Sequence, residues 1–325
     1  MSSSNVELID KLKGVRLEIL NELKKVIVGQ DDVLEKILIA LFANGHILLE
    51  GVPGLAKTLL ISSLSKALNL KFSRIQFTPD LMPSDITGTD ILSENKSDGK
   101  RYFEYIQGPI FANIILADEI NRTPPKTQAA LLQAMQEYEI TNGNQTYKLD
   151  QPFIVLATQN PIEQEGTYPL PEAQLDRFMF NIIIDYPSYA EEIEIVKVTT
   201  KAQTSQIKPV ISGKDIIAIQ RAILDIPVSE HVFEYAVKLV RKTRPNLEDS
   251  DPETSDLISW GAGPRASQYL VLAAKSRAAL QGRLTPSEDD VKFVAPLVLR
   301  HRVLPSFKAE AEGIKSTDII NKLLK

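Results

Sequence analysis

The sequence predicts an α/β domain built on a parallel five-stranded sheet, followed by an all-helical second domain. Three observations lead to this prediction. Within the first 187 residues, five short and mostly apolar segments alternate with helical or loop segments, which is typical of buried strands in a parallel sheet. A glycine-containing loop stands between the first of these segments and a helix. Beyond residue 187, helical periodicity and helix-capping patterns replace the strand signals.

The first predicted elements are two helices and a set of short strands. Apolar residues recur at steps of three and four from Leu8 to Val26, which indicates an amphipathic helix. A second helix is expected over residues 32–43, ending at Asn44-Gly45. The expected strands are residues 47–50, 72–78, 114–117, 153–158 and 179–185, with a helix at 128–138 between the third and the fourth.

Two segments interrupt this alternation and are predicted to be hairpin insertions. Residues 89–108 carry Asp98-Gly99, and residues 140–149 contain Asn142-Gly143, a favoured two-residue hairpin turn. The strand signals end near Tyr186. We therefore predict an α/β domain over residues 1–187, which includes the N-terminal helix and both hairpins, and a helical domain over residues 188–325.

The helical character of the second domain rests on helix-start signals. Three capping-box patterns precede stretches of helical periodicity, at Ser188/Glu191, Ser212/Asp215 and Thr285/Glu288. Residues 229–244 and 266–281 are also expected to be helices.

Length, composition and charge exclude several classes of function. The 325 residues correspond to roughly two domains. Cysteine is absent, which excludes disulfides, thiolate nucleophiles and Cys-ligated metals, and the three histidines have no metal-ligand spacing. A net charge of −5 gives the chain no general attraction to nucleic acid. No apolar run approaches the roughly 20 residues of a membrane span and no signal-peptide pattern is present, so we expect a cytoplasmic protein.

A phosphate-binding loop is predicted directly after the first strand. Glycines in such a loop let backbone N–H groups point at a phosphate, and the following helix adds positive potential at its N-terminus. Lys57 is expected to reach the β- and γ-phosphates, and Thr58 to ligate Mg²⁺. Ala56 stands where glycine is usual, and a simple glycine turn before a helix is the alternative. The residues assigned to the site are Gly51, Val52, Pro53, Gly54, Leu55, Ala56, Lys57, Thr58 and Leu59.

Two carboxylates at the end of the third strand are the expected second half of a nucleotide site. Asp118 and Glu119 follow an apolar strand, and neighbouring side chains of a strand point to opposite faces. The two acids can therefore have different functions. We expect Asp118 to hold the Mg²⁺ shell and Glu119 to polarise the attacking water.

Three further polar residues are candidates for the same chemistry. Asn160 follows the fourth strand and is expected to orient the water, although an Asn-Pro turn explains it as well. Arg177 is suited to stabilising negative charge on a phosphate, while a surface ion pair is the alternative. Arg265 stands at a helix start, where its charge opposes the helix dipole, and this mismatch hints at an anionic partner.

These motifs, in this order and spacing, resemble the MoxR family of AAA+ ATPases. The resemblance extends from about Val26 to the C-terminus, and Ala56 departs from the general phosphate-loop pattern but agrees with that of the family. It implies a P-loop NTPase core with Walker A and Walker B motifs and an α-helical lid. The matching segments are residues 28–30, 51–58, 118–122, 157–161, 170–178 and 263–266.

The resemblance also implies roles for residues and partners. It implies that the protein hydrolyses ATP to ADP and phosphate with Mg²⁺, and that Val28 and Gly29 lie near the adenine. Asn160 resembles the first sensor, and Arg265 resembles the second sensor, carried by the lid. Arg177 resembles the arginine finger, which acts on a neighbouring subunit. Arg122 is another candidate for the subunit interface.

The same resemblance implies a homo-hexameric ring with both hairpins towards its pore. It further implies a chaperone-like role that remodels, matures or activates protein complexes, and partners that contain von Willebrand factor A domains.

Two alternative functions belong to other classes. A ring that translocates nucleic acid is disfavoured by the net charge of −5, and the basic cluster Lys96, Lys100 and Arg101 is too small to support it. A nucleotide-gated scaffold with little turnover is disfavoured because Glu119, Asn160 and Arg177 are all present.

Overall fold

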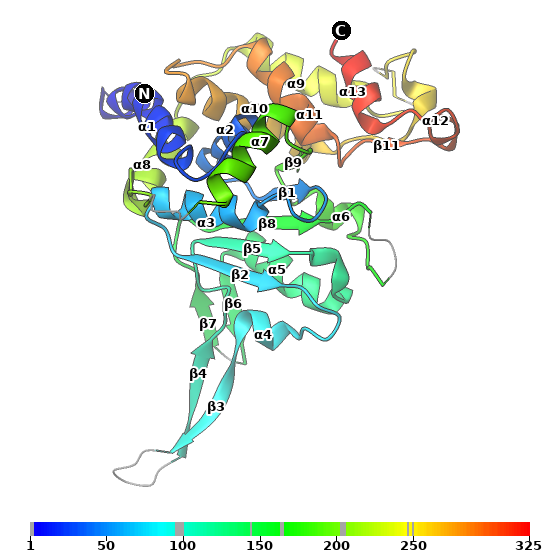
Figure 1. Ribbon diagram of the computed structural model, residues 1–325. Helices are drawn as coiled ribbons and strands as arrows, with labels where there is room; N and C mark the ends of the chain where they lie inside the picture. The colour runs from blue at the N-terminus through cyan, green and yellow to red at the C-terminus, as the bar shows by residue number, and fades with distance from the viewer. Residues whose placement is uncertain are drawn as a thin grey trace.

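The computed structural model describes residues 3–94, 101–143, 145–162, 166–201, 206–245, 247–248 and 250–325. A parallel sheet occupies the middle of the molecule (Figure 1). Helices from both ends of the chain cover one side of this sheet, and a long hairpin projects from the other side (Figure 1).

The predicted parallel five-stranded sheet is confirmed. Its strands pair in the order β2-β5-β8-β1-β9, and every pairing is parallel. The register aligns the carboxyl ends of the strands, because Gln76 pairs with Asp118 and Glu50 pairs with Gln159. The strand bounds are β1 Ile47–Glu50, β2 Phe72–Gln76, β5 Ile114–Asp118, β8 Ile154–Gln159 and β9 Phe180–Ile183.

Alternate residues of the central strands enter two different hydrophobic cores. Leu49, Leu116 and Leu156 belong to the core that the N-terminal helices and the later helices share. Their neighbours in sequence face the opposite core with α5, which explains why these strands are apolar throughout. The helices of the first half are α1 Ser3–Leu23, α2 Asp31–Phe42, α3 Lys57–Ala67, α4 Pro83–Thr87, η1 Ile120–Arg122, α5 Pro125–Glu137 and α6 Glu172–Leu175.

Residues 188–325, called the lid below, are helical with one exception. A two-stranded antiparallel pair, β10 Ile258–Trp260 with β11 Leu304–Pro305, joins two distant parts of the lid. The expectation of an all-helical lid was wrong in this detail, because strands of two or three residues leave no periodic signal. The lid helices are α7 Tyr189–Thr199, α8 Gly213–Leu224, α9 Glu230–Lys242, η2 Ser255–Leu257, α10 Pro264–Leu280, α11 Glu288–Leu299, α12 Phe307–Ala311 and α13 Ser316–Leu323.

Two of the three predicted capping boxes agree with the structure, and the one at α11 does not. Capping boxes form at Ser188 and Ser212, as expected. The third capping box lies at Ser287 with Asp290, not at Thr285 with Glu288, because α11 begins after Pro286 rather than at it. Helices α5 and α10 begin three and two residues earlier than expected, at Pro125 and Pro264.

The division of the chain at residue 187 is our proposal. Helix α1 packs against α3 of the core and also against α8 and α10 of the lid.

Two antiparallel hairpins leave the sheet and touch each other. They are β3 Gly88–Glu94 with β4 Arg101–Gln107, and β6 Glu139–Asn142 with β7 Gln145–Lys148. Tyr105 and Tyr147 stack with ring centroids 4.2 Å apart, and Asn142 donates to Asp90. The β3–β4 hairpin projects far from the sheet (Figure 1) and exposes Ile91, Leu92, Tyr102, Phe103 and Ile106. Lys96 and Lys100 lie outside the described residues.

Within the described part of the chain, we find no helix that is both long and apolar enough to cross a membrane.

Candidate nucleotide site

The loop after β1 folds tightly against the end of the sheet. A Cβ on Gly51 would lie 2.7 Å from the Ile184 carbonyl oxygen, so only glycine fits there. Gly54 and Ala56 both have left-handed backbone conformations, with φ values of 87° and 54°, and α3 begins directly afterwards at Lys57. An alanine in this conformation costs about 1–2 kcal/mol. The backbone therefore turns sharply enough for successive N–H groups to face inward.

Lys57 lies within this loop, near the two acids. Its Nζ donates a hydrogen bond to the Gly51 carbonyl oxygen at 2.5 Å. Burial lowers the pKa of Lys57, while the charges of Asp118 and Glu119 act in the opposite direction. The negative charges of Asp118 and Glu119 therefore help to keep the Lys57 ammonium group protonated.

The two acids have different partners, but strand alternation is not the reason, because β5 ends at Asp118 and Glu119 has a left-handed backbone. Asp118 accepts hydrogen bonds from the Thr158 hydroxyl at 2.6 Å and from the Arg74 guanidinium at 2.6 and 3.0 Å. Glu119 accepts from Gln76 Nε2 at 2.8 Å and forms an ion pair with Arg122 at 3.2 Å.

The backbone at Glu119 is left-handed, with φ of 57°, and its N–H donates to Thr158 Oγ1. Such a conformation is uncommon for a residue other than glycine and is concentrated at functional sites.

One open cavity of about 370 Å³ brings most of the predicted site together. It is lined by residues 53–58, Arg74, Asp118, Glu119 and residues 158–160. Asn160 is only 7% exposed, and its Oδ1 accepts the N–H of Ile162, so it forms the Asn-Pro turn and also lines the cavity. The two interpretations of Asn160 are therefore compatible.

Val28 and Gly29 lie in the turn between α1 and α2 rather than in the lining of this cavity. Gln30, the next residue, donates from Nε2 to the Leu55 carbonyl oxygen of the phosphate loop. Gly29 has φ of 69°, and a Cβ there would lie 2.4 Å from the carboxylate of Glu191 in α7. The turn is therefore held between the phosphate loop and the first lid helix.

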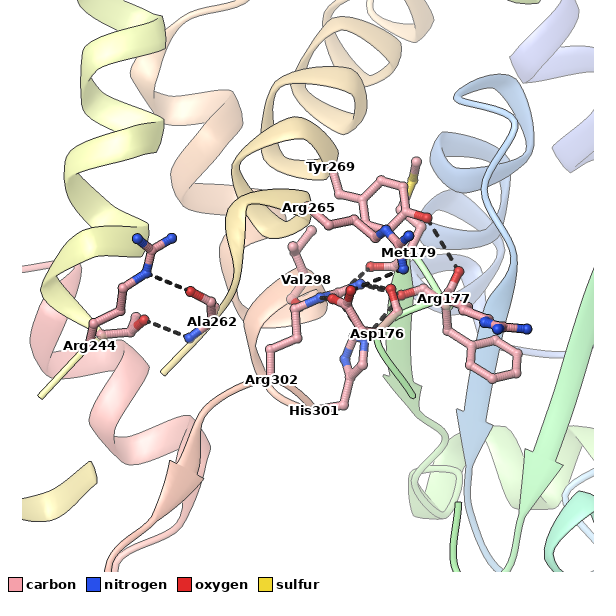
Figure 2. Close-up of polar contacts among 12 residues, drawn as sticks. Asp176, Arg177, Met179, Arg244, Ala262, Arg265, Tyr269, Val298, His301 and Arg302 are labelled. Carbon is pink, nitrogen blue, oxygen red and sulfur yellow. Dashed lines mark hydrogen bonds and ion pairs between the residues drawn. The ribbon is translucent and has the colours of Figure 1, made fainter. Parts of the chain in front are cut away.

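Arg177 and Arg265 lie outside the cavity and close to each other (Figure 2). Arg177 follows α6, and its Nη1 donates to the Leu132 carbonyl oxygen of α5 at 2.8 Å. Arg265 lies in the first turn of α10, is 41% exposed and forms an ion pair with Asp176 at 3.0 Å. The structure therefore divides the predicted residues into two groups within one chain.

The loop that enters α10 is fixed by the end of α9. Arg244 Nε donates to the Ala262 carbonyl oxygen at 2.8 Å, and the Ala262 N–H donates to Thr243 Oγ1 at 3.0 Å (Figure 2). A Cβ on Gly261 would lie 2.2 Å from the Thr243 carbonyl oxygen. These contacts fix the start of the helix that carries Arg265.

Sequence reasoning did not identify Arg74, Gln76 and Thr158 as site residues. Arg74 and Gln76 are two apart on β2, so they share a face of the strand, and both reach the acids. The sequence signal that could have identified them is a charged and an amide side chain, Arg74 and Gln76, near the carboxyl end of a predicted strand.

The cavity contains oxygen ligands that suit Mg²⁺. The Thr58 hydroxyl and the Asp118 carboxylate are hard oxygen ligands that line the same cavity. No group of three or more His, Cys, Asp or Glu side chains in the described residues forms a metal site. Two oxygen ligands, from Thr58 and Asp118, suit Mg²⁺, which usually takes only one or two ligands from protein carboxylates and the rest from phosphate and water.

Comparisons with known proteins show the family to which the chain belongs. A model of the ATPase family associated with various cellular activities (AAA) matches residues 46–180, and a model of the AAA lid domain matches residues 252–323. The chain is 44% identical to Chaperone MoxR1 of Mycobacterium tuberculosis over 93% of its own length and 79% of the relative. It is 32% identical to Protein MoxR of Methylorubrum extorquens over 87% of its own length and 85% of the relative.

A solved structure is also similar over nearly the whole chain. The crystal structure of a presumed ATPase from Cytophaga hutchinsonii superposes with a TM-score of 0.90 at 44% identity, covering 98% of this chain and 96% of that one. Fold, cavity and matches define an AAA+ ATPase core with its helical lid. Within that class, the chain belongs to the MoxR family.

Proposed function

We propose that this protein hydrolyses ATP to ADP and phosphate with Mg²⁺ and uses the reaction to remodel, mature or activate a partner protein complex. The observation that supports hydrolysis is the convergence of Lys57, Thr58, Asp118, Glu119 and Asn160 on one cavity. A scaffold that only binds nucleotide would not need an acid and an amide placed beside the phosphate loop.

Each of these side chains has a distinct task in the proposed reaction. Lys57 and the loop N–H groups hold the phosphates, and Thr58 and Asp118 hold the metal. Bound Mg²⁺ neutralises charge on the phosphate oxygens. Glu119 accepts a proton from the attacking water, and Asn160 orients that water.

We further propose that Arg177 and Arg265 act on the site of a neighbouring subunit in a homo-hexameric ring. Their position outside the cavity of their own chain supports this arrangement. Arginine supplied by a neighbour stabilises charge that develops on the transferred phosphoryl group. In such a ring, no single chain contains a complete catalytic site.

The proposed partner is a protein. The relative from Mycobacterium tuberculosis is named a chaperone, and the β3–β4 hairpin exposes apolar side chains that suit a protein contact. Proteins with von Willebrand factor A domains are the first candidates, because the resemblance to the family implies them. Capture with the Glu119→Gln variant in ATP, compared with the Lys57→Ala variant, tests for a partner that binds only the ATP-loaded state.

A mixing experiment tests the divided site. Lys57→Ala should lose ATP binding, and Arg177→Ala should bind ATP without turning it over, so each variant alone is inactive. Where a Lys57→Ala subunit supplies its intact Arg177 to the intact loop of an Arg177→Ala subunit, one complete site is restored. We expect phosphate release from the mixture at a clear fraction of the wild-type rate.

Co-assembly is checked separately by labelling the two variants and measuring their association. If the two chains associate and the mixture stays inactive, Arg177 does not act across the interface. If Lys57→Ala binds ATP with wild-type affinity in calorimetry, the phosphate-loop assignment is wrong.

A further inference from the structure

The short segment that carries Arg177 is bonded to the lid through each of its backbone carbonyls. Arg302 Nη2 donates to the carbonyl oxygens of Asp176 at 2.8 Å and Phe178 at 2.7 Å. Tyr269 Oη donates to the carbonyl oxygen of Arg177 at 3.3 Å. These three consecutive acceptors, residues 176–178, lie between α6 and β9 of the core, yet all their donors come from the lid (Figure 2).

Arg302 is the centre of this contact. Its side chain is only 3% exposed, its Nη1 donates to the Val298 carbonyl oxygen at 2.5 Å, and its guanidinium lies 5.1 Å from the centre of the Tyr269 ring. Its Nε donates to Asp176 Oδ1 at 2.7 Å. A planar guanidinium has five N–H donors in fixed directions, whereas an ammonium group has three donors on a single nitrogen that rotates. Arg302 therefore connects the carbonyl side of the segment to the lid, while the N–H groups of the segment bond to α6.

Asp176 connects this buried arginine to the exposed one. Its Oδ1 accepts from Arg302, and its Oδ2 accepts from Arg265 at 3.0 Å. The side chain of Arg177, by contrast, contacts the core at Leu132. The carbonyl oxygen of Arg177 thus bonds to the lid, its N–H donates to Gln174 of α6, and its guanidinium points away from the lid (Figure 2).

From these contacts we propose that Arg302 is a positioning residue for ATP hydrolysis, which ties the Arg177 segment to the lid so that Arg177 moves with it. The proposal rests on the proposed function, in which Arg177 serves a neighbouring subunit. A lid that shifts carries the start of α10 and the segment 176–178 as one body, so Arg265 and Arg177 approach a phosphate together. Because a displacement of about 1 Å can cost about 10²-fold in rate, loss of Arg302 should impair catalysis without changing any group that touches ATP.

Arg302→Lys is the variant that tests this role. Lysine keeps the buried charge beside Asp176, but its three N–H donors cannot serve four acceptors at once, namely Asp176 Oδ1 and the carbonyl oxygens of Asp176, Phe178 and Val298. We expect unchanged ATP affinity and a kcat lowered by roughly 10- to 100-fold. In the Arg177→Ala background, measured by single-turnover hydrolysis, Arg302→Lys should cause no further loss, because both changes remove the same contribution.

Mixing then assigns Arg302 to one half of the site. Arg302→Lys mixed with Lys57→Ala should regain activity, and Arg302→Lys mixed with Arg177→Ala should not. The matched control is Arg277→Lys, because Arg277 also pairs with a buried aspartate, Asp290, and also stacks on an aromatic ring, Phe293, in the lid. We expect this control to lose comparable stability and to keep the wild-type kcat.

Several outcomes would overturn the proposal. These are wild-type kcat in Arg302→Lys, weakened ATP affinity, a further loss in the Arg177→Ala background, or an equal loss of kcat in Arg277→Lys. If Arg302→Lys does not fold, Tyr269→Phe removes only the bond to the Arg177 carbonyl, and we expect a decrease in kcat of roughly twofold to tenfold from one neutral hydrogen bond. No decrease in that variant then overturns the proposal.

Failure of the proposed function gives a different pattern. If Lys57→Ala and Arg177→Ala co-assemble without activity, the action of Arg177 across the interface is excluded. The test in the Arg177→Ala background still decides whether Arg302 acts through Arg177.

Discussion

The nucleotide cavity and the junction around Asp176 hold their charged side chains by different means. In the cavity, the carboxyl ends of parallel strands set the positions, and residues such as Ala56 and Glu119 adopt left-handed backbone conformations. At the junction, residues 176–178 have no positive φ; their N–H groups donate to α6, and their carbonyl oxygens accept from Arg302 and Tyr269 of the lid.

The difference suggests that the cavity governs ATP binding and that the junction around Asp176 governs the rate of ATP hydrolysis. A site built on strand ends is rigid and can hold phosphate before any movement of the lid. A segment held by side chains of the lid follows the lid, because its hydrogen bonds move with their donors. In our proposal, one chain therefore contributes a nucleotide-binding half fixed by the sheet and a second half that moves with the lid and serves a neighbour.

The largest expected effect is a loss of kcat in Arg177→Ala, which distinguishes the junction from the nucleotide cavity. Arg177→Ala should lower kcat by about 10³–10⁵-fold, the contribution of an arginine finger, while the Kd for ATP stays at the wild-type value. Lys57→Ala should instead abolish ATP binding. Calorimetry for affinity and phosphate release for turnover measure both. If Arg177→Ala weakens ATP binding as Lys57→Ala does, the two regions are not separate.

A smaller loss of turnover is expected within the cavity itself. Glu119→Gln keeps the size of the side chain and removes the base, so hydrolysis should slow by about 10²–10⁴-fold with ATP still bound. Asp118→Asn should instead raise the Mg²⁺ concentration needed for activity. Arg74→Gln provides the matched comparison, because it removes the guanidinium that shares Asp118 and should lower that concentration. Wild-type turnover in Glu119→Gln would show that another group activates the water.

Acid should lower the free energy of unfolding through two buried histidines, His46 directly before β1 and His301 at the junction. Burial lowers the pKa of His46, in the core, to about 4, and burial together with Arg302 lowers the pKa of His301, at the junction. The unfolded chain then binds more protons than the folded one below about pH 6.5, so stability is complete above that pH and is lost as pH falls towards 4. For His46 the loss reaches about 3 kcal/mol in the free energy of unfolding.

Urea unfolding at a series of pH values measures this effect. His46→Gln keeps a donor for the Met135 carbonyl and an acceptor for the Val155 N–H, and should flatten the profile. His231→Gln, at an exposed position, is the control and should leave the profile as it is. A His46→Gln profile identical to that of the wild type contradicts the assignment.

The smallest expected effect concerns backbone strain in the phosphate loop. Ala56→Gly relieves the left-handed alanine and should raise the free energy of unfolding by up to about 1 kcal/mol, since the greater freedom of glycine in the unfolded chain offsets part of the gain. Ala134→Gly, within helix α5, should lower it by at least about 1 kcal/mol. Equal losses in the two variants would mean that Ala56 is not strained.

The parts of the site that the sequence predicted are short in sequence and fixed by local structure. A strand, a turn of defined residues and a helix place Lys57 and Thr58, and an apolar strand delivers Asp118 and Glu119 to the same edge. Asn160 was found in the same way. The β10–β11 pair in the lid was not predicted, because strands of two or three residues are too short to produce a recognisable alternation of apolar and polar residues.

What the sequence by itself determined about this protein is the order of its elements, its family and most of the residues that line the phosphate cavity. Only the tertiary structure decided that Arg177 and Arg265 lie away from that cavity and that Arg74 reaches Asp118. It also revealed Arg302 beside Asp176, a residue 126 positions earlier in the chain. Periodicity and capping act over a few residues, whereas these contacts depend on which strands pair and on how the lid docks on the segment before β9, which only the packed core fixes.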